Sequence, residues 1–253
     1  MATTTGAPGA VLDPTQIVRW RETWSQVMGK FVPHLASLEV TLCRVAEAVH
    51  GGAPDRVLDL GGGPGLLAER MARRWPDAEI TLMDIDPVLL ALARGALAGE
   101  VRALEGDLST PGWVDRAGGG HDLVTVVMTL HYLTPSQVRG FYDDARRCLA
   151  PGGLLIVADL MPDEGLPSLM TALNPAPNEA AAELAWAQWW SDIGEVEVLR
   201  PLLAQRAEIF GERLPAEFTA PASWHATAAR EAGFGEAGIL WRCGRHAALA
   251  AMV

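Results

Sequence analysis

The stretch Val57-Leu58-Asp59-Leu60-Gly61-Gly62-Gly63-Pro64-Gly65 decides the fold that we predict for this chain. It begins with an apolar run of the kind that forms a buried strand. Glycines follow, and they are needed where a loop turns tightly and its backbone must approach a ligand with no side chains between. The apolar residues of Leu66–Trp75 then have helical spacing. A strand, a glycine loop and a helix in this order predict the first unit of an α/β sheet, with a ligand at the carboxyl end of the strand.

Short apolar runs continue to alternate with helical segments as far as Asp159. This alternation is typical of a parallel sheet that helices cover on both faces. Further strands are expected at Ile80–Met83, Val101–Leu104, Leu123–Met128 and Leu154–Ala158, and further helices at Pro87–Ala98 and Pro135–Leu149.

Helical segments precede and interrupt this sheet. From Pro14 to Val49 the apolar spacing predicts two helices separated by Pro33, after a small-residue tail of about 12 residues that we expect to be disordered. After Met161 the chain again reads as helices, which we expect to form a lid at the edge of the sheet. The predicted segments are Ala180–Ile193 and Val196–Phe210 in the lid, followed by a helix at Ser223–Ala232 and two strands at Gly238–Arg242 and Ala247–Met252 that return to the sheet.

The overall charge and the cysteines exclude several classes of protein. The 253 residues include 20 Lys and Arg against 31 Asp and Glu, a net charge of −11, so we expect repulsion from polyanions and no nucleic-acid partner. Cys43, Cys148 and Cys243 are far apart and form no C-x-x-C pair, so we expect buried thiols in a reducing compartment, no disulfide framework and no metal site. The N-terminus lacks the plan of a signal peptide and no apolar stretch has the length that spans a bilayer. These features predict a cytoplasmic protein with no membrane partner.

Two further strands end in acidic residues. Asp84 follows the strand at Ile80–Met83 and is placed to accept hydrogen bonds from both hydroxyls of a ribose. Gly106-Asp107-Leu108 follows the next strand, where a carboxylate can accept from an adenine amino group while the following backbone N–H donates to the ring. Because parallel strands end at the same edge of a sheet, these residues and Asp59 predict an adenosine site.

This ordered series resembles the class I S-adenosylmethionine-dependent methyltransferases, a family with a D-x-G-x-G-x-G loop here at Asp59–Gly65. The resemblance continues through Asp122-Leu123-Val124 and Leu149-Ala-Pro-Gly-Gly-Leu-Leu and resumes at Ala232-Gly233-Phe234. It implies that S-adenosylmethionine is the cofactor and that its methionine part lies at the glycine loop. The positions implied to bind the cofactor are Asp59, Gly61, Gly62, Gly63, Asp84, Ile85, Gly106, Asp107, Leu108 and Met128.

The resemblance also implies the architecture. We expect a Rossmann-like, seven-stranded, mostly parallel sheet with helices on both faces. Along the chain, the disordered tail and the N-terminal helical cap occupy residues 1–50, and the cofactor-binding core occupies residues 51–160. The helical lid insertion covers residues 161–222, and residues 223–253 complete the core sheet.

Three other functions remain open at this stage. Gly63-x-Gly65-x-x-Ala68 also fits a dinucleotide-binding pattern, which would indicate an NAD-dependent oxidoreductase. A dinucleotide site requires neither Asp59 nor Asp107. The chain also has only one lysine, Lys30, that could take part in hydride-transfer chemistry. The C-terminal part, with Arg206 and His225, faintly resembles the carboxy-S-adenosylmethionine synthases, in which an arginine holds a carboxylate. A protein that binds the cofactor without catalysis is the third alternative.

His131 is the candidate catalytic residue. It lies in Thr129-Leu130-His131-Tyr132-Leu133, just after a strand that should end beside the cofactor. Methyl transfer is an in-line displacement, so alignment supplies most of the acceleration, and a base is needed only when the acceptor must lose a proton. The segment resembles small-molecule O-methyltransferases, which implies that His131 is a general base. A histidine that only lines the pocket is the alternative.

Tryptophans at helical spacing in the cap and the lid are candidate walls of an acceptor pocket. Because aromatic walls favour flat or apolar molecules, we expect a small, partly apolar or aromatic acceptor. We expect no counterpart of the large N-terminal dimerisation domain of the O-methyltransferases that the chain resembles, so a monomer and a homodimer both remain open. The candidate acceptor-binding residues are Trp20, Trp24, His131, Trp186 and Trp189.

Overall fold

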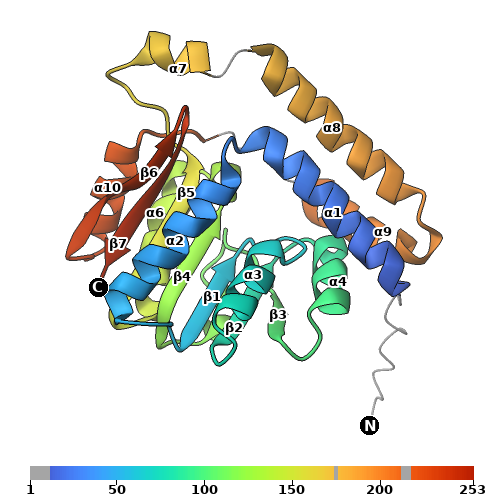
Figure 1. The fold of residues 1–253 in the computed structure, drawn as a ribbon, viewed down its shortest axis with the longest axis horizontal. Helices are drawn as coiled ribbons and strands as arrows, with labels where there is room; N and C mark the ends of the chain where they lie inside the picture. The colour runs from blue at the N-terminus through green and yellow to red at the C-terminus, as the bar shows by residue number, and fades with distance from the viewer. Residues whose placement is uncertain (1–11, 174–175, 212–217) are drawn as a thin grey trace.

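The computed structural model describes residues 12–173, 176–211 and 218–253 (Figure 1). The tail that we predicted to be disordered lies outside the described residues, apart from its last position. The strands in the described part are β1 Arg56–Leu60, β2 Glu79–Asp84, β3 Val101–Glu105, β4 His121–Val127, β5 Leu149–Leu160, β6 Glu236–Cys243 and β7 His246–Met252.

These strands form one sheet in the order β3-β2-β1-β4-β5-β7-β6, which has seven strands within the described residues. The pairs from β3 to β5 are all parallel, and β7 runs antiparallel to both of its neighbours. The prediction of a mostly parallel, Rossmann-like sheet is therefore confirmed. Because β1 and β4 are neighbours, the loops that follow them come together at the carboxyl edge of the sheet.

Helices cover both faces of the sheet because its central strands are apolar on both sides. In β1, Leu58 and Leu60 pack into one core while Val57 packs into the other, as the alternation of a strand requires. The first core is closed by α5 (Trp113–Ala117), α6 (Pro135–Cys148) and α10 (Ala222–Glu231), and the second by α2 (Leu35–His50), α3 (Leu66–Arg74) and α4 (Pro87–Ala96).

A third cluster joins the N-terminal helix to the lid. α1 (Pro14–Phe31) begins where Asp13 caps the helix and Pro14 fixes its first turn. The segment that we predicted to be a lid contains α7 (Pro167–Leu173), α8 (Ala176–Gly194), the short 3-10 helix η2 (Glu197–Leu199) and α9 (Arg200–Gly211), and we keep the name lid for these helices. Figure 1 shows α8 running alongside α1, beyond the carboxyl end of β1. Trp20, Trp24 and Trp189 are buried between these helices and α4, and Trp186 and Trp190 are half-buried at the same cluster.

Several boundaries differ from those predicted, and three of them have a clear cause or consequence in the structure. Met128 was expected in the fourth strand, but its φ of +52° ends that strand at Val127, and the chain turns into the 3-10 helix η1 (Leu130–Tyr132). The fifth strand begins at Leu149 because that residue pairs with His121, before an irregularity in the register. The predicted helix Val196–Phe210 is divided into η2 and α9, with α9 beginning at Arg200.

The cysteines are unpaired. Cys43 and Cys148 are buried, as expected, whereas Cys243 is only half-buried because it lies at the end of the edge strand β6. Among the described residues, no group of three or more His, Cys, Asp or Glu side chains is placed to hold a metal ion. No helix in the described part of the chain combines the length and the apolar character needed to cross a membrane.

Candidate functional site

The glycine loop between β1 and α3 is bound to the neighbouring strand. The backbone N–H groups of Gly61 and Gly62 donate to the carbonyl of Met83 at 2.7 and 3.2 Å. A Cβ on Gly62 would lie 2.7 Å from the Oδ2 atom of Asp59, and one on Gly61 would clash with the side chain of Thr129. At Gly61 and Gly62 the loop therefore leaves no space for side chains, as the sequence indicated.

Asp59 is a buried acid with one unpartnered oxygen. Its Oδ1 atom accepts a hydrogen bond from the Thr125 hydroxyl at 2.8 Å, while Oδ2 has no partner among the described residues. Burial raises the pKa of Asp59 to about 7, although the Thr125 hydrogen bond opposes the shift; the charge of Asp84 adds to it. A buried carboxylate oxygen beside a glycine loop is suited to a cationic group of a ligand, such as an ammonium.

Asp84 ends β2 and is held by backbone donors. Its Oδ2 atom accepts from Gly63 at 2.7 Å and its Oδ1 atom accepts from the N–H of Asp86 at 2.8 Å. Burial raises the pKa of Asp84 to about 6, opposed by these hydrogen bonds and assisted by the charge of Asp86. Because each carboxylate oxygen accepts more than one hydrogen bond, this orientation still suits it to the two hydroxyls of a ribose.

The end of β3 joins the same edge. Gly106 donates its N–H to the carbonyl of Asp84 at 2.9 Å, and a Cβ there would lie 2.2 Å from the sulfur of Met83. Asp107 accepts hydrogen bonds from the N–H and hydroxyl of Ser109, so it shapes its own turn. Ile85 and Leu108 are half-buried beside these acids in the chain. Contact of these residues with an adenine stays a prediction.

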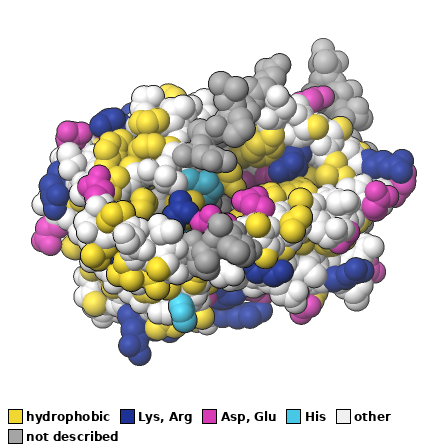
Figure 2. All heavy atoms as spheres, turned by 90° about the horizontal axis from the view of Figure 1, so that it is seen from above, with side chains coloured by type: hydrophobic (Ala, Val, Ile, Leu, Met, Phe, Trp, Pro, Cys, Tyr) yellow, Lys and Arg dark blue, Asp and Glu magenta, His cyan; other side chains and the backbone are white. Residues whose placement is uncertain are grey.

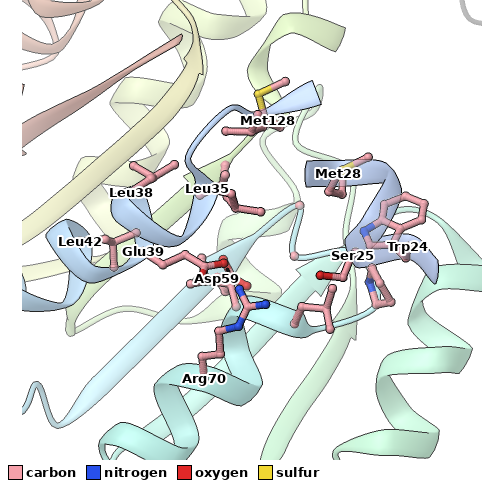
Figure 3. Close-up of a pocket in the computed structure, with 18 residues that line it drawn as sticks. Trp24, Ser25, Met28, Leu35, Leu38, Glu39, Leu42, Asp59, Arg70 and Met128 are labelled. Atoms are coloured by element: carbon pink, nitrogen blue, oxygen red, sulfur yellow. Dashed lines mark hydrogen bonds and ion pairs between the residues drawn. The ribbon is translucent and has the colours of Figure 1, made fainter. Parts of the chain in front are cut away.

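A cavity of about 120 Å³ lies between the glycine loop and the helices α1 and α2. Its lining includes Asp59, Gly61–Gly63, Met128 and Trp24. Figure 3 shows the side chains of Asp59, Met128 and Trp24 around it. Pockets for whole small-molecule ligands measure roughly 300–1,000 Å³, so this cavity suits one end of a ligand. Asp84 is not among its lining residues, so a nucleoside at the strand ends would extend outside it.

Sequence reasoning missed Arg21, which fastens α1 over this cavity. The buried guanidinium donates to the carbonyls of Pro64 and Gly65, at 2.9 and 3.3 Å, and pairs with Glu69 at 2.8 Å. These contacts hold the N-terminal helix on the carboxyl side of the glycine loop. In the sequence, Arg21 could be recognised only as part of an amphipathic helix, because its hydrogen-bond partners are more than 40 residues away in the chain.

His131 lies on η1 and is paired with an acid that sequence reasoning also missed. Its Nδ1 atom is 2.7 Å from Oδ1 of Asp159, at the end of β5. The Oδ2 atom of Asp159 accepts from the backbone N–H groups of Thr129, Leu130 and His131. An acidic residue directly after the apolar run Leu154–Ala158 was the available signal.

The surroundings of Asp159 keep it ionised. Burial acts to raise its pKa, but the hydrogen bond and charge of His131, together with backbone donors, hold the pKa below its ordinary value. An ionised Asp159 accepts the Nδ1 proton of His131, which leaves Nε2 as the proton acceptor of the ring. This assignment follows from the hydrogen-bond network.

The candidate acceptor tryptophans pack against one another. The rings of Trp24 and Trp189 are 4.9 Å apart, those of Trp24 and Trp186 are 5.1 Å apart, and those of Trp20 and Trp189 are 5.7 Å apart. Trp24 alone of these four lines the cavity beside the glycine loop. The structure gives the others a packing role between α1 and α8, and their contact with an acceptor stays a prediction.

The two residues behind the synthase alternative both have partners within the protein. Arg206 pairs with Asp86, at 2.6 Å between Nε and Oδ2. His225 is buried and hydrogen-bonded to the hydroxyl of Tyr142 at 3.0 Å, and burial lowers the pKa of His225 to about 4.

Figure 2 views the molecule from the side of the lid and shows hydrophobic side chains around a central area where acidic, basic and histidine side chains meet.

Comparison with known proteins assigns the central part of the chain to a family. A family model described as a methyltransferase domain matches residues 57–153. Demethylmenaquinone methyltransferase of Thermus thermophilus is 37% identical over 113 residues, which are 44% of this chain and 49% of that protein. Malonyl-[acyl-carrier protein] O-methyltransferase of Hahella chejuensis is 31% identical over 112 residues, 44% of this chain and 38% of that protein. The chain thus spans half or less of the length of these curated relatives.

Solved structures extend the likeness of fold to nearly the whole chain. Human N-acetylserotonin methyltransferase in complex with SAM has a TM-score of 0.57 at 16% identity, over 95% of this chain and 56% of that one. PigF with SAH has a TM-score of 0.56 at 17% identity, over 94% of this chain and 59% of that one. These structures show a shared fold. The family model and the curated relatives show that residues 57–153 are a methyltransferase domain, in agreement with the strand-end motifs of the S-adenosylmethionine-dependent class.

Proposed function

We propose that this protein transfers a methyl group from S-adenosylmethionine to a hydroxyl group of a small, partly apolar or aromatic molecule. The observation that carries this proposal is the contact between His131 and Asp159, 2.7 Å between Nδ1 and Oδ1, at the carboxyl edge of the sheet. A hydroxyl must lose its proton to become a good nucleophile, and a histidine held by a buried carboxylate suits that task.

The site fits the cofactor of the family. The Oδ2 atom of Asp59, which has no partner among the described residues, would accept a hydrogen bond from the ammonium of the methionine part, and Asp84 would accept from the ribose. The glycine loop provides a backbone wall that a Cβ at Gly62 would fill. When bound, the cofactor supplies an electrophilic methyl group on a positively charged sulfur. Asp59 and Asp84 also bring negative charge to the edge of the sheet where this cation would lie.

In the proposed reaction, His131 orients the acceptor hydroxyl and takes its proton at Nε2. Asp159 holds the ring in the required tautomer and stabilises the imidazolium that forms, as a buried acid does for other histidine bases. Three backbone N–H groups on Oδ2 keep Asp159 in place during this step. Most of the acceleration comes from alignment, and the base adds roughly 10²–10⁴-fold.

The acceptor class follows from the charge and from the walls of the site. The net charge of −11 disfavours a polyanionic acceptor, although one relative, ribosomal RNA small subunit methyltransferase C of Pseudomonas entomophila, is named for RNA. Trp24, Met28 and the leucines of α2 provide apolar walls at the cavity. We propose a small-molecule acceptor and a monomeric or homodimeric protein. The carboxy-S-adenosylmethionine synthase alternative is not favoured by the relatives.

Two measurements test this function. Calorimetric titration with S-adenosylhomocysteine should show saturable binding, and release of S-adenosylhomocysteine should then be followed against a panel of phenols, aliphatic alcohols, amines and carboxylates. Turnover with hydroxyl compounds that collapses in His131→Ala supports the proposal. Turnover only with RNA, or with amines at an unchanged rate in His131→Ala, would refute it. Binding without turnover on any class would favour the non-catalytic alternative.

A further inference from the structure

Arg206 on α9 connects the lid to the nucleoside end of the cofactor site. Its Nε atom lies 2.6 Å from the Oδ2 atom of Asp86, a residue 120 positions earlier in the chain. The guanidinium carbon lies 3.5 Å from the ring centroid of Trp190 on α8 and 4.8 Å from that of Phe210. A guanidinium that pairs with a carboxylate and also stacks on aromatic rings is held in one orientation.

Asp86 passes this contact on to the cofactor site. Its side chain is buried, and its Oδ1 atom caps α4 by accepting from the N–H groups of Val88 and Leu89. Its own N–H donates to Oδ1 of Asp84 at 2.8 Å, and Oδ2 of Asp84 accepts from Gly63. A short series of hydrogen bonds therefore joins the lid to the glycine loop through the acid that we assign to the ribose.

The side chains of α9 are half-buried at most. None of the described side chains of this helix is buried, and Leu202 and Leu203 only reach the edge of the tryptophan cluster. Because helices usually dock through a buried apolar face and α9 has none, the contact of Arg206 with a buried carboxylate contributes to the docking of α9 beside its half-buried apolar side chains. The side chain of Arg206 is itself 26% exposed, which is compatible with reversible docking.

We propose that Arg206 is a positioning residue that couples the helical lid to the cofactor site through Asp86, so that cofactor binding and lid docking stabilise each other. This inference rests on the proposed function, since it concerns the same cofactor site. The coupling is reciprocal: the factor by which the docked lid strengthens cofactor binding equals the factor by which the cofactor strengthens docking.

The test combines hydrogen exchange of the full chain with calorimetric binding of S-adenosylhomocysteine. The variants are Arg206→Gln, Asp86→Asn and the double variant. Asparagine is used at position 86 because it also caps helices well. The control is Arg200→Gln on the same helix. Arg200 pairs with Glu197, and both of these side chains are exposed. In the wild type and the control, S-adenosylhomocysteine should slow exchange in α9.

In Arg206→Gln and in Asp86→Asn we expect faster exchange in α9 without ligand and a loss of affinity of about 5–50-fold, within the usual range of coupling between sites. The double variant should lose no more than either single variant, because both remove the same contact. If α9 exchanges alike in the wild type and in Arg206→Gln, or if affinity is unchanged in both single variants, the inference is wrong while the proposed function stands. If the wild type binds no S-adenosylhomocysteine, the proposed function fails, and the coupling fails with it.

Discussion

Replacing Asp59 with asparagine should make the protein more stable and its cofactor site weaker. Burial raises the pKa of Asp59 to about 7, from an ordinary value of 3.8, so the folded state binds the proton more tightly than the unfolded state does. An acid of this kind contributes its full stability below pH 3.8 and loses it as the pH rises through about 7. At pH 8 the ionised carboxylate therefore opposes folding.

The size of the effect follows from this difference in pKa. At about 1.4 kcal/mol for each tenfold change in proton affinity, the interval from 3.8 to about 7 corresponds to an upper limit of about 4 kcal/mol at pH 8. The amide N–H₂ of asparagine would replace the unpartnered Oδ2, and a buried donor without a partner costs about 1–3 kcal/mol. We expect a net gain of about 2 kcal/mol, which raises Tm by about 4–8 °C in a chain of this size.

Thermal unfolding of the ligand-free protein at pH 8 and at pH 5 measures this gain, with Asp143→Asn on the exposed face of α6 as the control. The gain should shrink to about 1 kcal/mol or less at pH 5, because the wild-type carboxyl is then protonated in the folded state. Calorimetry should show at least about tenfold weaker binding of S-adenosylhomocysteine, since a charge-assisted hydrogen bond contributes about 1.5–3 kcal/mol. A lower Tm at pH 8, or unchanged affinity, would refute the reasoning.

Three further predictions concern the same edge of the sheet. His131→Ala should lower kcat about 10²–10⁴-fold with nearly unchanged cofactor affinity, and Asp159→Asn should lower kcat too. If kcat of His131→Ala falls less than about fivefold and its pH profile is unaltered, His131 only lines the pocket. Asp84→Ala should weaken binding of S-adenosylhomocysteine by about 1.5–3 kcal/mol in titration calorimetry, and equal affinities would exclude Asp84 as the ribose ligand. Affinity for S-adenosylhomocysteine should rise from pH 5 to pH 8. The pKa of Asp84 is raised to about 6 and that of Asp59 to about 7, and both carboxyl groups must ionise to bind the cofactor. An affinity that does not change with pH would contradict this assignment.

The amino-acid sequence by itself determined the sheet and the order of its motifs. The run from Val57 to Gly65 specified a strand, a loop and a helix because each depends on residues that are neighbours in the chain. Asp84 and Gly106 could be placed at the same edge because parallel strands joined by helices must end on the same side. Their hydrogen bonds to the glycine loop and to each other in the structure follow from that rule.

Only the tertiary structure decided which side chains meet. Asp159 pairs with His131 because β4 and β5 are neighbours and end together, and no pattern within either strand specifies the partner. The tryptophans of α1 and α8 pack against each other since both helices bury an apolar face there, which helical spacing alone could not tell from a pocket wall. Arg206 reaches Asp86 across 120 residues. Contacts of this kind depend on how elements pack in space, and the local periodicity of a sequence carries no information about them.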